Sequence, residues 1–123
     1  MQQALNRYYE TQINTATPEE LTLMLYNGCI RFIKQAHNFM LVNDVNGKSQ
    51  AISKAINIIN ELQATLNMEY EISKQLESLY IYFQERLLYV SIHLDQEALE
   101  EILGMITELR DTWHEAMKMV NKK

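Results

Sequence analysis

Residues 17–42 read TPEELTLMLYNGCIRFIKQAHNFMLV and carry the strongest local signal in the chain. Thr17 is a favoured helix N-cap, Pro18 suits the first helical position, and Glu20 stands three residues after the cap, as in a capping box. A helix is therefore predicted over residues 18–42. The apolar residues that follow the cap recur at helical spacing, at Leu21, Leu25, Phe32, Ala36 and Phe39.

Three more apolar stripes with helical spacing follow this segment. Turn-forming residues at 43–47 predict a reversal, and Asp95 is placed to cap the last helix. The break at residues 67–71 contains no Gly or Pro and is predicted only because the stripe changes phase there. The stripes consist of Ile52, Ile56, Ile59, Leu62 and Leu66; then Ile72, Leu76, Leu79, Phe83, Leu87, Val90 and Leu94; then Leu99, Ile102, Ile106, Leu109, Trp113, Ala116 and Val120.

The composition supports an all-α fold. Among 123 residues there are 3 Gly and 1 Pro, too few for the many turns of an all-β protein. Hydrophobic residues make up 47% of the chain, enough for a core, and the short connections make neighbouring helices antiparallel. We expect one domain over residues 1–123. Residues 17–120 are predicted to form an antiparallel up-down-up-down four-helix bundle, and residues 1–16 an N-terminal arm or short helix.

The charge pattern and hydropathy exclude several kinds of partner. The net charge is −5 and the basic residues are scattered, so no face suited to nucleic acid is visible. No segment is long and apolar enough to cross a membrane, and residues 1–4 do not resemble a secretory signal. The chain is therefore expected to be cytoplasmic, without membrane insertion.

The residues that usually carry chemistry do not form a recognisable constellation. A di-metal site in a bundle needs two Glu-x-x-His pairs, and only Asp111-x-x-His114 comes near that pattern. Cys29 lies within an apolar helical segment and is interpreted as a small buried hydrophobe. No phosphate loop or nucleophile elbow is present. We therefore expect no enzyme activity, no metal and no cofactor.

Helical segments 18–42, 52–66 and 72–94 carry more apolar residues than a four-helix core requires. These second rows predict either a burial partner or ordinary packing in an irregular bundle. The partner could be the chain's own N-terminal arm, which contains Leu5, Tyr8, Tyr9 and Ile13, or another protein. The second rows consist of Leu23, Tyr26, Ile30, Ile33 and His37; then Ala51 and Ile58; then Ile81, Tyr82, Leu88, Tyr89 and Ile92.

Several blocks of the sequence resemble the bacterial flagellar secretion chaperone dedicated to flagellin. The first block is residues 15–21, followed by 23–32. Further matching blocks, in the same order and with approximate spacing, are Lys54-Ala55, Ile58 to Leu62, Leu79 to Tyr82, Arg86-Leu87 and Leu109 to Trp113. The resemblance covers nearly the whole chain, although Asn27, Cys29 and residues 67–71 depart from the family's usual pattern.

The resemblance implies a client and a fold. Family members are mainly antiparallel four-helix bundles that bind the disordered C-terminal segment of flagellin, prevent its polymerisation in the cytoplasm, and deliver it to the flagellar type III export apparatus. It also implies that the N-terminal arm can occupy part of the groove when no client is bound. An alternative is an adaptor or regulatory bundle, or a homodimer, that uses the same apolar face; the chain is expected to be a monomer or weak homodimer.

The predicted client-binding residues lie outside the primary stripes. If Ile30 lies on this surface, Ile30→Asp should abolish binding and leave the helices intact. The residues are Tyr8 and Ile13 on the arm, Leu23, Tyr26, Ile30 and Ile33 on the first long helix, Ile58 on the second, and Tyr82, Leu88 and Tyr89 on the third.

Overall fold

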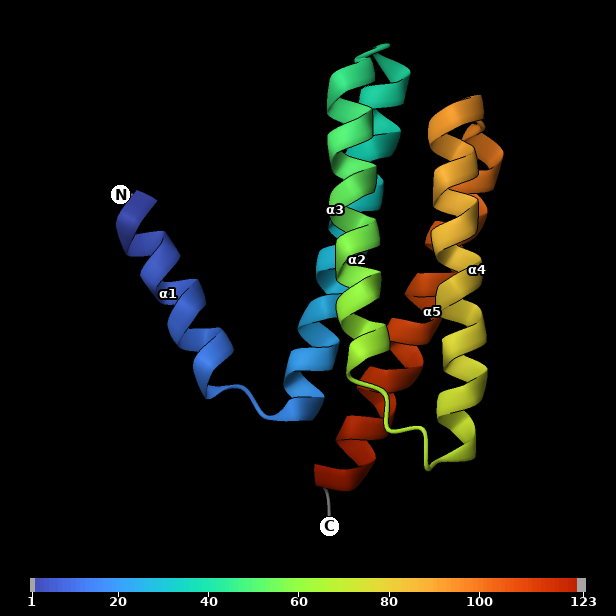
Figure 1. Ribbon diagram of the computed structural model, residues 1–123. Helices are drawn as coiled ribbons and strands as arrows, with labels where there is room; N and C mark the ends of the chain where they lie inside the picture. The colour runs from blue at the N-terminus through green and yellow to red at the C-terminus, as the bar shows by residue number, and fades with distance from the viewer. Residues whose placement is uncertain (1, 122–123) are drawn as a thin grey trace.

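The fold is a bundle of four long helices preceded by a fifth that stands apart (Figure 1). The computed structural model describes residues 2–121, without the side chains of Gln2, Leu5, Asn6, Tyr8, Tyr9, Gln12, Ile13 and Asn121. No strand occurs within that part. The predicted all-α four-helix bundle is confirmed. The helices are α1 Gln2–Thr15, α2 Pro18–Leu41, α3 Val45–Ala64, α4 Glu71–His93 and α5 Gln96–Asn121.

Side-chain caps fix three of the helix starts. The Thr17 hydroxyl accepts a hydrogen bond from the Glu20 backbone N–H at 3.1 Å and so begins α2. Asp44 caps α3 by accepting from Gly47 N at 2.9 Å, and Asp95 accepts from Ala98 N at 3.0 Å at the start of α5. These caps satisfy amide groups that have no partner within the helix.

The helices pack in a closed cycle. α2 packs against α3 and α5, and α4 packs against the same two helices from the other side. The α2–α3 and α4–α5 turns lie at one end of the bundle, and the longer α3–α4 connection lies at the other (Figure 1). Neighbouring helices are therefore antiparallel, as the short connections predict.

A buried lysine joins two helices at the end where the two short turns lie. Lys48 is 4% exposed, and its Nζ donates to the Ser91 carbonyl oxygen at 2.8 Å. Ser91 lies in the last turn of α4, where carbonyl groups lack helical partners and carry partial negative charge. Lys48 therefore ties α3 to the C-terminal end of α4.

The core row of α2 is not the one that the spacing predicts. Of the predicted stripe only Ala36 is buried, and Leu21, Leu25, Phe32 and Phe39 are half-buried. Phe32 lies near Lys54 of α3, and Phe39 lies near Gly47 of α3. α2 has two neighbours, so its core-facing direction lies between them, and the row in that direction is fully covered. The buried residues of α2 are Tyr26, Cys29, Ile30, Ile33, Ala36 and Met40.

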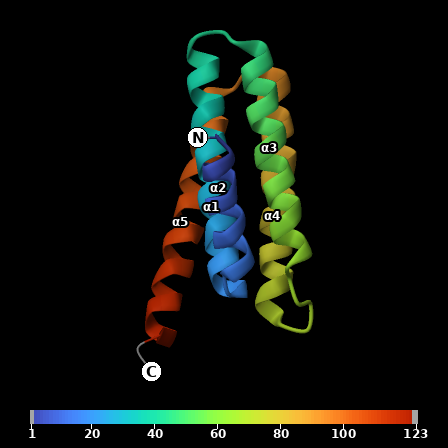
Figure 2. The same cartoon turned by 90° about the vertical axis from the view of Figure 1, so that its left-hand side faces the viewer.

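Helix α1 stands away from the bundle. Residues 16–17 connect α1 to α2, and Figure 1 shows the two helices pointing away from each other on either side of this connection. In the view of Figure 2, α1 lies in front of α2, between α3 and α5. The predicted N-terminal segment is therefore helical. Because α1 points away from the bundle, it leaves most of the outer side of α2 and α3 uncovered.

Two tyrosine hydroxyls form a hydrogen bond inside the core. Tyr26 and Tyr80 are each 2% exposed, and their hydroxyl oxygens are 2.6 Å apart. Burial raises the pKa of both phenols above the ordinary value of 10.0. Each hydroxyl is thus the other's partner across the bundle, between α2 and α4.

Removing one of these hydroxyls should cost more than removing both. Tyr80→Phe leaves the Tyr26 hydroxyl buried without a partner and should lower the free energy of unfolding by about 1–3 kcal/mol. The Tyr26→Phe/Tyr80→Phe double variant should be closer to wild type than either single variant. Urea unfolding followed by circular dichroism measures all three. Single effects that simply add in the double variant would show that the two hydroxyls do not depend on each other.

The thiol of Cys29 should make the fold sensitive to alkaline pH. Cys29 is fully buried, and burial raises the pKa of its thiol from 9.0 to about 12. Between these values the unfolded chain loses the thiol proton while the folded chain keeps it. The contribution to stability is therefore complete below pH 9 and is lost as the pH rises through 12, at about 1.4 kcal/mol per pH unit.

A Cys29→Ala variant provides the control for this alkaline loss. Urea unfolding at intervals from pH 8 to 10 should give a free energy that falls more steeply in wild type than in the variant. Above pH 10 the buried tyrosines add a similar loss to both proteins. Equal slopes between pH 9 and 10 would contradict the assignment to Cys29.

Candidate functional site

The structure buries three of the predicted client-binding residues. Tyr26, Ile30 and Ile33 are 2%, 5% and 0% exposed and belong to the core. The prediction that they form an open surface on α2 is wrong, because the row they form points between α3 and α5. They are not available to a partner of the folded bundle.

The remaining predicted residues lie on separate parts of the surface. Leu23 is half-buried on α2, and Ile58 on α3 packs so close to Gly28 that an added Cβ there would lie 3.2 Å from Ile58 Cδ1. The side chains of Tyr8 and Ile13 lie outside the described residues. The structure therefore does not gather the ten predicted residues into one site.

A row of exposed apolar side chains lies on α4. Ile81, Leu88 and Ile92 are 40%, 55% and 76% exposed, and their spacings of seven and four residues place them on one helix face. We call these three residues the α4 strip. Leu88 was predicted as a site residue, and Ile81 and Ile92 belong to the same second row in the sequence. The core-facing side of α4 carries Phe83 and Leu87 instead.

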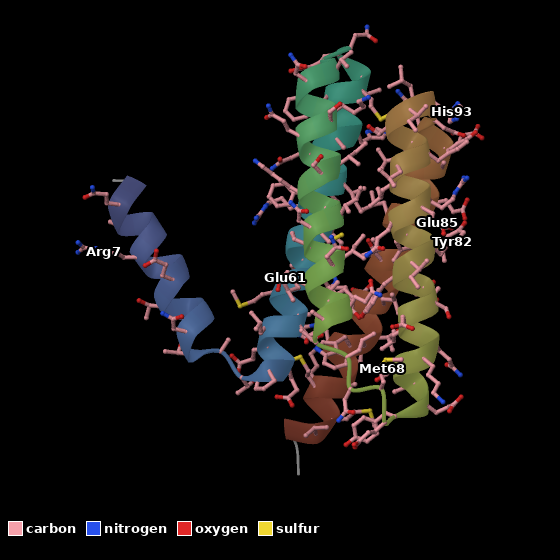
Figure 3. All side chains as sticks on the ribbon, viewed as in Figure 1. Arg7, Glu61, Met68, Tyr82, Glu85 and His93 are labelled. Carbon is pink, nitrogen blue, oxygen red and sulfur yellow. The ribbon has the colours of Figure 1, made fainter. Side chains whose placement is uncertain are left out.

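A column of aromatic and basic side chains runs beside the α4 strip. The Arg86 guanidinium carbon lies 4.8 Å from the centre of the Tyr89 ring, and Tyr89 lies 4.3 Å from the His93 ring. The Tyr82 hydroxyl donates to Glu101 Oε1 at 2.9 Å, and this hydrogen bond raises the pKa of Tyr82. Figure 3 shows Tyr82 and His93 on the outer side of α4. Tyr82 and Tyr89 thus border the strip on the side towards α5.

A second partly apolar surface lies where α2 meets α3. The half-buried ring of Phe32 has the Arg31 guanidinium carbon 5.1 Å and the Lys54 Nζ 5.4 Å from its centre. Leu25 and Ile58 are half-buried on the same two helices and pack against the core. This surface offers apolar area together with positive charge.

A cavity of about 360 Å³ opens between the start of α2 and the end of α5. Trp113 closes its inner side, with its indole N–H donating to the Glu19 carbonyl oxygen at 3.0 Å. Trp113 also packs edge-on against Tyr26, with ring centres 6.5 Å apart. The cavity therefore lies next to the connection from α1. It is lined by Thr17, Glu19, Glu20, Trp113, Ala116, Met117 and Val120.

Within residues 2–121 no three His, Cys, Asp or Glu side chains come together as a metal site would require. In the same part of the chain no helix combines the length and the hydropathy needed to cross a membrane. The described residues offer a partner two apolar surfaces, each with a basic side chain beside it: Arg86 at the α4 strip, and Arg31 and Lys54 at Phe32.

The chain is similar to flagellar chaperones over almost its full length. The family described as "Flagellar protein FliS" matches residues 1–120. The flagellar secretion chaperone FliS of Bacillus subtilis (strain 168) is 40% identical over 122 residues, which cover 99% of this chain and 92% of that protein. FliS of Salmonella typhimurium is 37% identical over 107 residues, covering 85% of this chain and 79% of the relative.

The same name is carried by a relative from Escherichia coli (strain K12), which is 34% identical over 111 residues, or 88% of this chain and 82% of that protein. These matches confirm the resemblance seen in the sequence blocks. They agree with the fold, since a four-helix bundle is what that resemblance implies. The chain belongs to the FliS family of flagellar secretion chaperones.

Proposed function

We propose that this protein is an export chaperone that binds the disordered C-terminal segment of flagellin in the cytoplasm. Binding keeps the segment from polymerising, and the complex is delivered to the flagellar type III export apparatus. The protein acts by occupancy, without catalysis or a cofactor. The observation that carries the proposal is the exposed α4 strip on a chain of this family.

A disordered client needs a long apolar track on its chaperone. Ordering the client on binding costs conformational entropy, and burial of apolar surface has to compensate for it. The α4 strip suits the apolar face of an amphipathic helix, because Leu88 and Ile92 are one helical turn apart. Tyr82 and Tyr89 extend the track with side chains that combine an apolar ring and a polar end.

Occupancy alone accounts for the block on polymerisation. A segment that lies folded against the bundle cannot pack against another flagellin subunit at the same time. The chaperone therefore needs neither a nucleotide nor a reaction, only an affinity high enough to keep the segment bound. Of the predicted residues, Leu23, Ile58, Tyr82, Leu88 and Tyr89 remain candidate contacts. Tyr8 and Ile13, whose side chains lie outside the described residues, remain candidates from the sequence alone.

A titration of the purified protein against a peptide of the flagellin C-terminal segment from the same organism tests this function. Calorimetry should show one peptide per chain and a large negative heat capacity change, and far-UV circular dichroism should show a gain of helix in the mixture. Sedimentation at several protein concentrations tests the alternative in which a second copy covers the strip. A stable dimer that does not bind the peptide would overturn the proposal.

A further inference from the structure

The surface around Phe32 holds two positive charges close to one aromatic ring. Arg31 comes from α2 and Lys54 from α3, and both charged groups lie within 5.4 Å of the ring centre. The negative face of an aromatic ring attracts cations at this distance. The Phe32 ring thus lies close to two positive charges that come from different helices.

Neither cation has a carboxylate partner in the described part of the chain. Ion pairs there join His37 with Glu100, Lys74 with Glu71, Arg110 with Asp111 and Lys118 with Glu115. The residues three and four positions away from Arg31 are Asn27, Gly28, Lys34 and Gln35, and those around Lys54 are Gln50, Ala51, Asn57 and Ile58. This lack of acidic neighbours is unusual in a chain with 16 acidic residues and a net charge of −5.

The surface next to the two cations is apolar. Phe32 and Ile58 are half-buried and pack against the core, so part of each side chain remains open to a partner. Gly28 has no side chain and lets Ile58 approach α2 closely. Helix α1 stands away from this side of α2 (Figure 1). An apolar group placed here would lie close to two positive charges.

We propose that the Phe32 surface binds carboxylate side chains of the client segment, an inference that rests on the proposed function. The chaperone then recognises an apolar stretch that carries Asp or Glu, and a purely apolar stretch binds less well. A carboxylate near the Phe32 ring is attracted by both Arg31 and Lys54, and these attractions are strengthened where the client excludes water. The overall negative charge of the protein disfavours a polyanion such as nucleic acid. A single carboxylate on an apolar peptide suits an apolar surface with two cations beside it.

Reversing one charge on each partner tests this inference. Lys54→Glu should weaken binding of the flagellin C-terminal peptide about tenfold, because an attraction becomes a repulsion. Lys118→Glu is the matched control, since Lys118 is an exposed lysine on α5, outside both apolar surfaces, and the change in net charge is the same. It should alter the affinity less than about twofold. Circular dichroism and urea unfolding should show that both variants fold.

The peptide provides the reciprocal half of the experiment. Peptides in which one Asp or Glu at a time is changed to Lys should include one that binds Lys54→Glu more tightly than it binds wild type. Equal losses from Lys54→Glu and Lys118→Glu would show that only the net charge matters and would overturn the inference. Unchanged binding by both variants would overturn it and leave the proposed function standing, whereas a wild-type protein that does not bind the peptide would overturn both.

Discussion

Ile30→Asp is expected to unfold the bundle. Ile30 is 5% exposed within the core, so the variant would bury a carboxylate that has no partner there. Burying an unpaired polar or charged group is among the most destabilising substitutions, and we expect a loss of at least about 4 kcal/mol. The expectation from the sequence, that this variant loses binding and keeps its helices, is therefore reversed. Urea unfolding monitored by circular dichroism measures the effect.

Leu88→Asp is the control for this unfolding. Leu88 is 55% exposed on the α4 strip, so the new carboxylate remains in water and should change stability by less than about 1 kcal/mol. The two variants introduce the same side chain and differ in burial. A folded, stable Ile30→Asp protein would place Ile30 at the surface and contradict the packing of α2.

Leu88→Gln combined with Ile92→Gln is expected to weaken client binding by roughly 30-fold, as for the loss of a binding hot spot. Glutamine is a good helix former and uncharged, so both the helix and the net charge are kept. The loss comes from apolar contact, since the two side chains are 55% and 76% exposed and have little packing to lose within the bundle. Calorimetric titration with the flagellin peptide measures the change.

Val42→Gln combined with Val45→Gln is the matched control. These residues are 70% and 60% exposed at the turn between α2 and α3 and do not belong to the α4 strip. The control variant should bind the peptide within about twofold of wild type, as for residues outside an interface. Equal losses in both double variants would show that any exposed apolar residue serves the client, and that the strip is not a specific site.

Much of the fold could be predicted from local signals. The Thr17 and Asp95 caps and the four apolar stripes predict helices that the structure confirms, with bounds close to those expected. The short connections give the antiparallel order. These features depend on neighbours in sequence, which is why one sequence suffices to predict them.

The orientation of α2 could not be predicted in the same way. Both of its apolar rows have helical spacing, and only the positions of α3 and α5 decide that Tyr26, Ile30 and Ile33 face the core while Phe32 lies at its edge. An apolar row can be recognised from the sequence of α2 alone, whereas its burial depends on where α3 and α5 lie. On α4 the second row was predicted to lie outside the core, because that helix has one clearly stronger stripe. The structure agrees, since Leu88 and Tyr89 are exposed.

The Lys48 contact with Ser91 gives the two ends of the bundle different freedom to open. At that end two short turns join α2 to α3 and α4 to α5, and the buried ammonium ties α3 to α4. The other end has the longer α3–α4 connection. Amide hydrogen exchange should therefore be slowest near Lys48 and become faster along each helix towards the opposite end. Local opening of the bundle would therefore begin at the end with the α3–α4 connection, which is also the end where residues 16–17 connect α1 to α2.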